Sequence, residues 1–295
     1  MYINWFNDWL KLHIFDSVRP HDPPTDVSGP AIWGWLLIAV LAAQFAVGIA
    51  LAVRWTRRDP QLFPRPMVLM LFLTPFICTF QEALGDWEGG LWYSKDTPLI
   101  LFTMLERPIP FWVALLWFAW IPLGTMIVYR MVATGVSVRT IVITAVALGF
   151  AEMGTEAVAC NTGLMDYYGY FVTVFGVPPT QFLTNGFMYV FIGVALAYLV
   201  PWLQNSSLGA WKWTLVVPTV MGGFIACLTL ALPLFIVGAL LREHPLVNWA
   251  CTLLGLVLTV VGSLALLNSK WVKLFRDHRA AISQGGVAMD EVAAN

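Results

Sequence analysis

The feature that most constrains this chain is a series of long apolar segments that follow one another with only short polar connections. A helix that spans a bilayer needs about 20 mostly apolar residues. Seven segments of this kind lie near 31–53, 67–84, 110–130, 139–160, 181–203, 213–241 and 248–269. Charged residues make up 11% of the chain, against about 25% in an ordinary soluble domain. The sequence therefore predicts an all-α fold, a polytopic membrane bundle of about seven transmembrane helices.

The two ends of the chain differ from this apolar region. Residues 1–30 carry Asp8, Lys11 and Asp16 well before any long apolar run, which is not the pattern of a signal peptide. Large apolar side chains recur in this segment at helical spacing, which predicts an amphipathic helix in the membrane interface. We expect three parts: an outside interfacial arm at 1–30, a seven-helix transmembrane domain at 31–269, and a cytoplasmic tail at 270–295 that is basic and then flexible.

The distribution of Lys and Arg predicts the orientation, because cytoplasmic loops of membrane proteins carry an excess of both. If the N-terminus is outside, the cytoplasmic segments hold eleven basic residues, which are Arg54, Arg57, Arg58, Arg65, Arg130, Arg139, Lys212, Lys270, Lys273, Arg276 and Arg279. The outside segments then hold five, which are Lys11, Arg19, Lys95, Arg107 and Arg242. We therefore expect a multi-pass protein of the cell membrane with its N-terminus outside and its C-terminus in the cytoplasm.

Two carboxylates, Glu152 and Glu156, fall inside the predicted span 139–160 and are the strongest indication of function. At about 1.5 Å per residue from Arg139, they lie roughly 20 Å and 25 Å above the cytoplasmic boundary, in the outer half. Their i, i+4 spacing places both on one helical face. At least one is expected to be protonated, and a carboxylic acid beside a carboxylate suits general acid/base catalysis. The alternative is that both only hydrogen-bond to neighbouring helices and support packing.

Further acids and aromatic residues are expected at the same membrane depth. Glu82 and Asp86 form a second i, i+4 pair at the end of the span 67–84, and Asp166 follows the span 139–160. These three are candidates for orienting a substrate or stabilising charge. The candidate substrate-binding residues are Trp87, Trp92, Tyr93, Tyr167, Tyr168, Asn161 and Asn185. Aromatic faces stabilise developing positive charge, but the alternative is that these rings form only an interfacial belt.

Several other chemistries lack their residues in this sequence. All four histidines lie outside the predicted spans, which argues against a histidine-ligated di-iron site or a haem pair. The sequence has no aspartate-rich motif for magnesium and diphosphate, and its four cysteines form no CxxC pair. The net charge is -1 and no long basic block occurs. We therefore expect no metal ion, no cofactor and no nucleic-acid partner.

Four short motifs resemble those of the AveC-like spirocyclase family. They are Gly90-Leu91-Trp92-Tyr93, Arg107-Pro108-Ile109-Pro110, the region of Glu152, and Thr162-Gly163-Leu164 through Tyr167-Tyr168-Gly169, and the resemblance spans roughly residues 70–205. It implies a multi-pass membrane protein linked to dehydration and spiroketal formation on polyketides. The general plan is also similar to that of the seven-span membrane terpene cyclases, which use membrane carboxylates to start a cationic cyclisation.

These observations lead to one expected function and two alternatives. We expect a metal-free membrane cyclase or dehydratase that acts on a lipophilic polyketide or isoprenoid, with spiroketal formation favoured. Glu152 and Glu156 would share the acid and base roles, and the expected partners are a lipophilic small molecule and the lipid bilayer. The first alternative is a proton-coupled transporter or carrier in which the two glutamates form a relay. The second is a seven-span receptor or scaffold.

Overall fold

The computed structural model of the chain describes residues 24, 26–88, 90–168, 173–241, 244–270 and 272–273. Most of the predicted interfacial arm, and the predicted tail from residue 274 onward, lie outside the described residues. Seven long helices form the described part, and they are α2 (Ala31–Arg58), α3 (Arg65–Glu88), α4 (Phe111–Ala133), α5 (Val138–Asn161), α6 (Pro179–Asn205), α7 (Val216–Leu240) and α8 (Pro245–Leu267). A short 3-10 helix, η2 (Ala210–Leu215), precedes α7.

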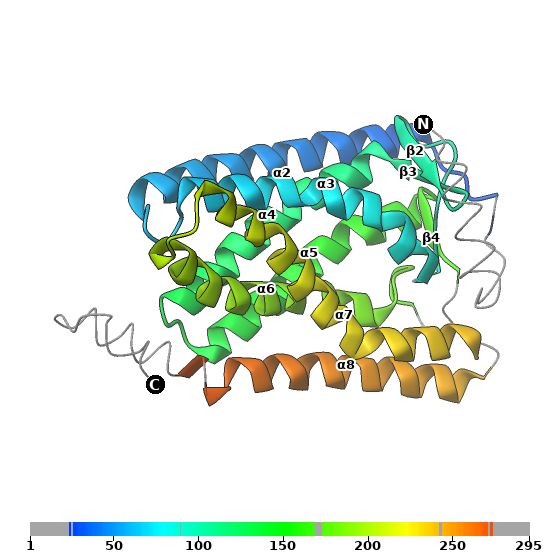
Figure 1. Ribbon diagram of the computed structural model, residues 1–295. Coiled ribbons are helices and arrows are strands. Elements are labelled where there is room, and N and C mark those ends of the chain that lie inside the picture. Colours follow the sequence, from blue (N-terminus) through cyan, green and yellow to red (C-terminus); the bar gives the residue numbers. More distant parts are fainter. Residues whose placement is uncertain are drawn as a thin grey trace.

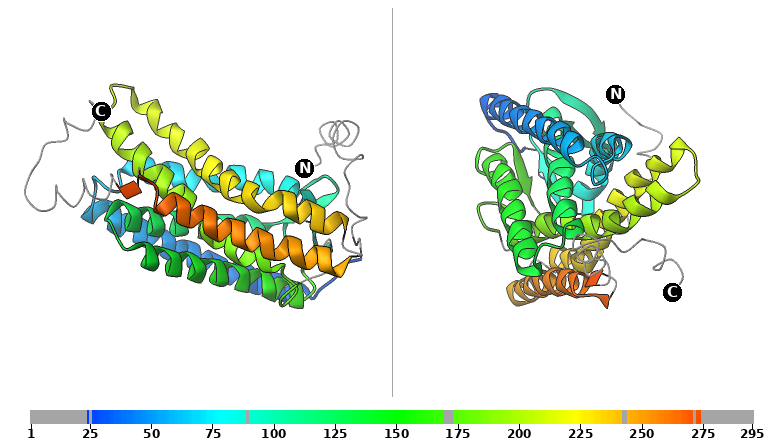
Figure 2. Two further views of the ribbon diagram at one scale, coloured as in Figure 1. Left: turned by 90° about the horizontal axis from the view of Figure 1, so that it is seen from below. Right: turned by 90° about the vertical axis from the view of Figure 1, so that its left-hand side faces the viewer.

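These helices confirm the predicted seven-segment pattern. Within the described residues, seven helices are long and apolar enough to cross a membrane. In α3 the apolar span is Arg65–Ala83, and the helix continues beyond it to Glu88. The helices run roughly along one axis, with α2 on one side of the bundle and α8 on the opposite side (Figures 1 and 2). The chain therefore forms a helical bundle suited to a bilayer, while its orientation stays a prediction.

α6 lies at the centre of the bundle and packs against α4, α5, α7 and α8. The α5–α6 contact depends on two glycines that allow the two backbones to touch. A Cβ added at Gly149 would lie 1.9 Å from the carbonyl oxygen of Phe182, and one added at Gly186 would lie 2.0 Å from the carbonyl oxygen of Ala145. Small residues are typical of close helix contacts in membranes. This contact places the acid-bearing face of α5 directly beside α6.

Two small antiparallel sheets, which were not predicted, lie at one end of the helical bundle (Figure 1). Strand β1 (Leu91–Tyr93) pairs with β4 (Met165–Tyr167), and β2 (Ile100–Met104) pairs with β3 (Arg107–Pro110). Because β1 follows α3 and β4 follows α5, the first sheet joins the ends of the two helices that carry the acid pairs. Strands of three to five residues are too short to give a periodic signal in the sequence.

The two ends of the bundle differ in charge. The loops after α2, α4 and α6 lie at the end opposite to the sheets (Figure 1), and this end carries Arg54, Arg57, Arg58, Arg65, Arg130, Arg139, Lys212, Lys270 and Lys273. Arg130 also forms an ion pair with Asp59 there, at 2.9 Å. The basic residues assigned to the cytoplasmic side, where the structure describes them, therefore share one end, which we call the basic end.

Candidate functional site

A cavity of about 100 Å³ lies near the sheet end of the bundle, between α3, α4, α5, α6, α7 and the β1–β4 sheet. Four carboxylates and several apolar or aromatic side chains line it. The lining residues are Glu82, Gly85, Asp86, Leu91, Leu116, Trp117, Glu152, Glu156, Tyr167, Gln181, Asn185, Phe224 and Leu228. We call this space the acid cavity. It combines several titratable groups with an otherwise apolar wall.

The four carboxylates come from two helices that face each other across the acid cavity. Glu82 and Asp86 lie one turn apart on α3, and Glu152 and Glu156 lie one turn apart on α5. Each pair occupies one helical face, as the i, i+4 spacing requires. Asp86 and Glu152 are only 3% and 1% exposed. The structure thus brings together the two acid pairs, a juxtaposition that helical periodicity alone does not determine.

Tyrosine hydroxyl groups hold the four carboxylates in position. Tyr189 on α6 donates a hydrogen bond of 3.0 Å to Oε2 of Glu152, and Tyr167 on β4 donates one to Oε2 of Glu156. Tyr93 on β1 is within hydrogen-bonding distance of both α3 carboxylates. Such bonds restrict side-chain rotation, so the acids are held in place before a substrate binds.

The indole of Trp117 adds a second contact to Glu82. Its Nε1–H on α4 donates a hydrogen bond of 2.8 Å to Oε2 of Glu82, while Tyr93 donates to Oε1 of the same carboxylate. Both oxygens of Glu82 are therefore engaged by the protein. The Trp117 ring also packs edge-on against Phe224 of α7, with 5.6 Å between the ring centroids. Trp117 thus links the acid pair of α3 to the apolar wall of the cavity.

Asp86 differs from Glu82 because one of its oxygens has no protein contact. Its Oδ1 accepts a hydrogen bond of 3.3 Å from Tyr93, whereas the buried Oδ2 has no hydrogen-bond partner among the described residues. Asp86 lies beyond the apolar span of α3, and burial raises its pKa well above the ordinary value. The charge of Glu82 raises this pKa further, while the charge of Arg107 lowers it. On balance the pKa of Asp86 is raised, so its carboxyl group keeps its proton to a higher pH than an aspartate in water does.

The alternation of side chains along β1 and β4 decides which predicted residues reach the acid cavity. Leu91 is paired with Tyr167 in the β1–β4 ladder, and both line the cavity. Trp92 is paired with Asp166, and successive residues of a strand point to opposite faces. Accordingly, neither Trp92 nor Asp166 lines the cavity, and Asp166 is exposed. Partial burial of its carboxyl group still raises the pKa of Asp166, and the charge of Asp26 raises it further.

Trp92 and Tyr168 instead contact Arg107, a buried residue that was predicted as an outside charge and as part of a family motif but not as a site residue. The Arg107 side chain is 3% exposed. Its guanidinium lies 5.3 Å from the Trp92 ring centroid and donates a hydrogen bond of 2.8 Å to the Tyr168 hydroxyl. It also donates to the carbonyl oxygens of Leu91 and Leu105, at 3.3 Å and 3.1 Å. Arg107 therefore fixes the strands that carry the cavity tyrosines and adds positive charge near Asp86.

The remaining predicted residues have different positions. Asn185 on α6 lines the acid cavity. Asn161 is exposed at the end of α5, where its amide donates to the carbonyl oxygens of Ala157 and Phe175 at 2.7 Å and 2.8 Å. The side chain of Trp87 lies outside the described residues. Trp117, Gln181 and Phe224 were not predicted, because single polar or aromatic residues within apolar helices carry no distinctive signal.

No three or more His, Cys, Asp and Glu side chains in the described ranges are grouped so that they could hold a metal ion. Comparisons with protein-family models, with curated proteins and with solved structures find no match to this chain. The functional argument therefore depends on the geometry and charge of the acid cavity.

Proposed function

We propose that this chain is a membrane-embedded cyclase or dehydratase that acts on a lipophilic polyketide or isoprenoid by general acid/base catalysis, with spiroketal formation favoured. The observation that supports this proposal is the convergence of two carboxylate pairs on one cavity with apolar walls. In addition, the Oδ2 atom of Asp86 is buried there without a hydrogen-bond partner among the described residues. Unpartnered buried polar atoms are rare, so this oxygen is available to a substrate.

Spiroketal formation from a dihydroxyketone needs one proton donor and one proton acceptor. Protonated Asp86 donates its proton to the ketone oxygen while a substrate hydroxyl attacks the carbonyl carbon, and Glu156 accepts the proton of that hydroxyl. The product of this step is a hemiketal. Glu156 then protonates the hemiketal hydroxyl, which leaves as water, and Asp86 accepts the proton of the second attacking hydroxyl. One water is lost overall, and both carboxyl groups return to their starting states.

The walls of the acid cavity fit a lipophilic substrate that forms a cationic intermediate. Leu116, Phe224 and Leu228 contribute apolar surface, and the ring of Trp117 is suited to stabilise the positive charge of an oxocarbenium ion. A cavity of about 100 Å³ is smaller than the roughly 300–1,000 Å³ of typical ligand sites. Substrate binding therefore requires the helices to separate, and Gly85, an exposed lining residue of α3, marks the place where the cavity reaches the surface.

Comparative metabolite profiling tests this proposal. Cells that express wild type, Asp86→Asn or the double variant Glu152→Gln/Glu156→Gln are compared by mass spectrometry at matched membrane levels. We expect a lipophilic precursor to accumulate in both variants, and an isomer or a product that has lost water to disappear. Asp166→Asn is the matched control, because its side chain lies away from the cavity. Identical product profiles in wild type and both cavity variants would contradict the enzymatic proposal.

A proton-coupled carrier is the second candidate, and the small volume of the acid cavity favours it. About 100 Å³ accommodates roughly three water molecules at about 30 Å³ each, and water between four carboxylates is suited to proton transfer. Proteoliposome flux measurements distinguish this candidate from the first. A carrier gives pH-dependent solute flux that Glu156→Gln abolishes, and it produces no chemical conversion of the solute.

A further inference from the structure

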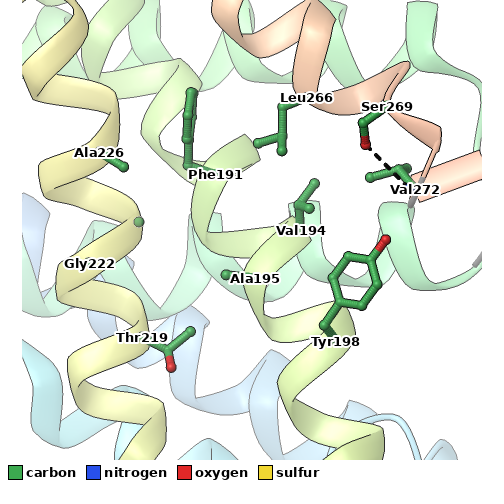
Figure 3. Close-up of a pocket in the computed structure, with 11 residues that line it drawn as sticks. Phe191, Val194, Ala195, Tyr198, Thr219, Gly222, Ala226, Leu266, Ser269 and Val272 are labelled. Atoms are coloured by element: carbon green, nitrogen blue, oxygen red, sulfur yellow. Dashed lines mark hydrogen bonds between the residues drawn. The ribbon is translucent and has the colours of Figure 1, made fainter. Parts of the chain in front are cut away.

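A second and larger cavity, of about 720 Å³, lies between α6, α7 and α8 (Figure 3). Its wall is almost entirely apolar and includes Phe191 and Val194 of α6, Ala226 of α7 and Leu266 of α8. It opens at the surface of the bundle, among helices that are apolar enough to span a membrane. We call it the α6–α8 groove.

The α6–α8 groove is separate from the acid cavity. On α6, Asn185 faces the acid cavity and Val194 faces the groove, and nine helical residues at 100° each place them on opposite sides of the helix. On α7, Phe224 lines the acid cavity and Ala226 lines the groove. The groove therefore has no part in the proposed acid/base chemistry. The residues around the groove have to indicate what binds there.

The groove occupies the half of the bundle nearer to the basic end. On α7 it runs from Thr219 to Ala226, which is about 10 Å at 1.5 Å per residue. One leaflet of the hydrocarbon core is about 15 Å thick, so the groove fits within a single leaflet. Its length and apolar wall are suited to a lipid acyl chain that lies parallel to the helices.

Basic residues mark one end of the groove. Ser269 and Val272 belong to its wall, and the exposed Lys270 and Lys273 directly follow them in the chain. The hydroxyl of Tyr198 points toward Ser269 and Val272 (Figure 3). An apolar groove with a tyrosine in its wall, and with two exposed lysines next to wall residues in the chain, has the pattern of a phospholipid site, because acyl chains need apolar contacts and phosphate groups need cations.

We propose that the α6–α8 groove binds an acyl chain of an anionic phospholipid from the leaflet at the basic end, with the lipid phosphate contacting Lys270 and Lys273. The apolar wall holds lipids of any headgroup, and the two lysines confer the preference for negative charge. Two surface lysines are sufficient for about a thirtyfold preference for an anionic over a zwitterionic headgroup.

Native mass spectrometry of the full chain in a mild detergent tests this proposal. The protein is titrated with phosphatidylglycerol and with phosphatidylcholine of the same acyl chains. We expect wild type to retain one phosphatidylglycerol with about thirtyfold higher affinity, and Lys270→Gln/Lys273→Gln to lose this preference while still binding both lipids. Equal affinity of wild type for the two lipids would overturn the proposal.

A second variant tests the proposal by filling the groove with a larger side chain. A Cβ at Gly222, which lines the groove, meets no atom within 4 Å, so the larger side chain of Gly222→Leu is expected to extend into the groove. We expect this variant to lose the retained lipid. Gly154→Leu is the matched control, because Gly154 on α5 is equally open and lies outside the groove. Unchanged lipid retention in Gly222→Leu, or a dimer of the chain that only Gly222→Leu disrupts, would show that lipid is not the occupant.

Discussion

At the residue scale, Asp86 combines burial, a contact with Tyr93 and an oxygen that no described residue contacts. A carboxyl group in water is ionised above a pH of about 4 and cannot act as an acid at neutral pH. Burial and the charges of Glu82 and Glu156 raise the pKa of Asp86, so the proton stays bound at a higher pH. The environment of Asp86, and not its residue type, therefore makes it suited to donate a proton.

The pH dependence of turnover follows from this raised pKa. The proposed first step needs a protonated Asp86 and an ionised Glu156, so kcat/KM falls at low pH, where Glu156 is protonated, and also falls as the pH rises through the pKa of Asp86. Because the pKa of Asp86 is raised, we expect this second fall well above a pH of about 4, where an ordinary aspartate ionises. Glu82→Gln removes a negative charge that raises this pKa, so the fall should move to lower pH. The pH–rate profiles of wild type and Glu82→Gln in nanodiscs measure the pH at which kcat/KM falls. A fall with rising pH near pH 4 in wild type would contradict the role of Asp86. The same would follow if the fall occurred at the same pH in Glu82→Gln as in wild type.

The sequence predicted the acid pairs, and Tyr93 and Tyr167 near them, but it did not predict which of these side chains contact each other. The i, i+4 spacing within one helix determines that Glu152 and Glu156 share a face. Which face of α3 meets which face of α5 depends on long-range packing, which a single sequence does not encode in its periodicity. The tyrosine donors Tyr93 and Tyr167 depend on the register of β1 against β4, and two strands of three residues give no alternation from which this register follows.

At the scale of elements, the close contact between α5 and α6 positions the second acid pair. We expect Gly149→Ala to lower the free energy of unfolding by about 1–3 kcal/mol or more, because the added methyl group would meet the Phe182 carbonyl at 1.9 Å and force the helices apart. Thermal unfolding in detergent compares this variant with Gly154→Ala, whose Cβ meets no atom within 4 Å. Equal unfolding temperatures of the two variants would mean that the contact does not stabilise the fold.

The exposed position of Gly85 on α3 leads to a second prediction at this scale, which concerns substrate access to the acid cavity. A Cβ at Gly85 meets no atom within 4 Å, so Gly85→Leu should leave the fold intact and narrow the opening of the acid cavity. We expect kcat/KM to fall by about tenfold or more through a higher KM, since the catalytic groups are unchanged. A fall in kcat at constant KM would place the effect on the chemical step and not on substrate access.

Helices and strands differed in how well the sequence predicted them. Each of the seven helices contains a long apolar run, and a span of about 20 residues is long enough to give a strong hydropathy signal. The β2–β3 hairpin gave no such signal, because its turn places Leu105 and Glu106 at φ values of 52° and 64° without the glycine or asparagine that marks most such turns. Arg107 is the first residue of β3. Because the hairpin was not predicted, the buried position of Arg107 was not predicted either.

At the scale of the whole molecule, charge separates the two ends of the bundle. The positive-inside rule predicts that the basic end is cytoplasmic, and this orientation places the acid cavity in the outer half of the membrane. Cysteines introduced as Lys95→Cys and Ser207→Cys lie at opposite ends. We expect an impermeant thiol reagent to label Lys95→Cys in intact cells and Ser207→Cys only after permeabilisation, with wild type as the background. The reverse pattern would contradict the predicted orientation.

Conversion of a lipophilic precursor by the purified protein is the most direct test of the central claim. The lipid-soluble extract of cells that express Asp86→Asn is incubated with nanodiscs that contain wild type, Asp86→Asn or no protein, and the products are followed by mass spectrometry. We predict that only wild type converts a component of the extract to an isomer or to a product that has lost one water. If wild-type nanodiscs change no component, or if Asp86→Asn converts it at the same rate, the acid cavity is not a catalytic site.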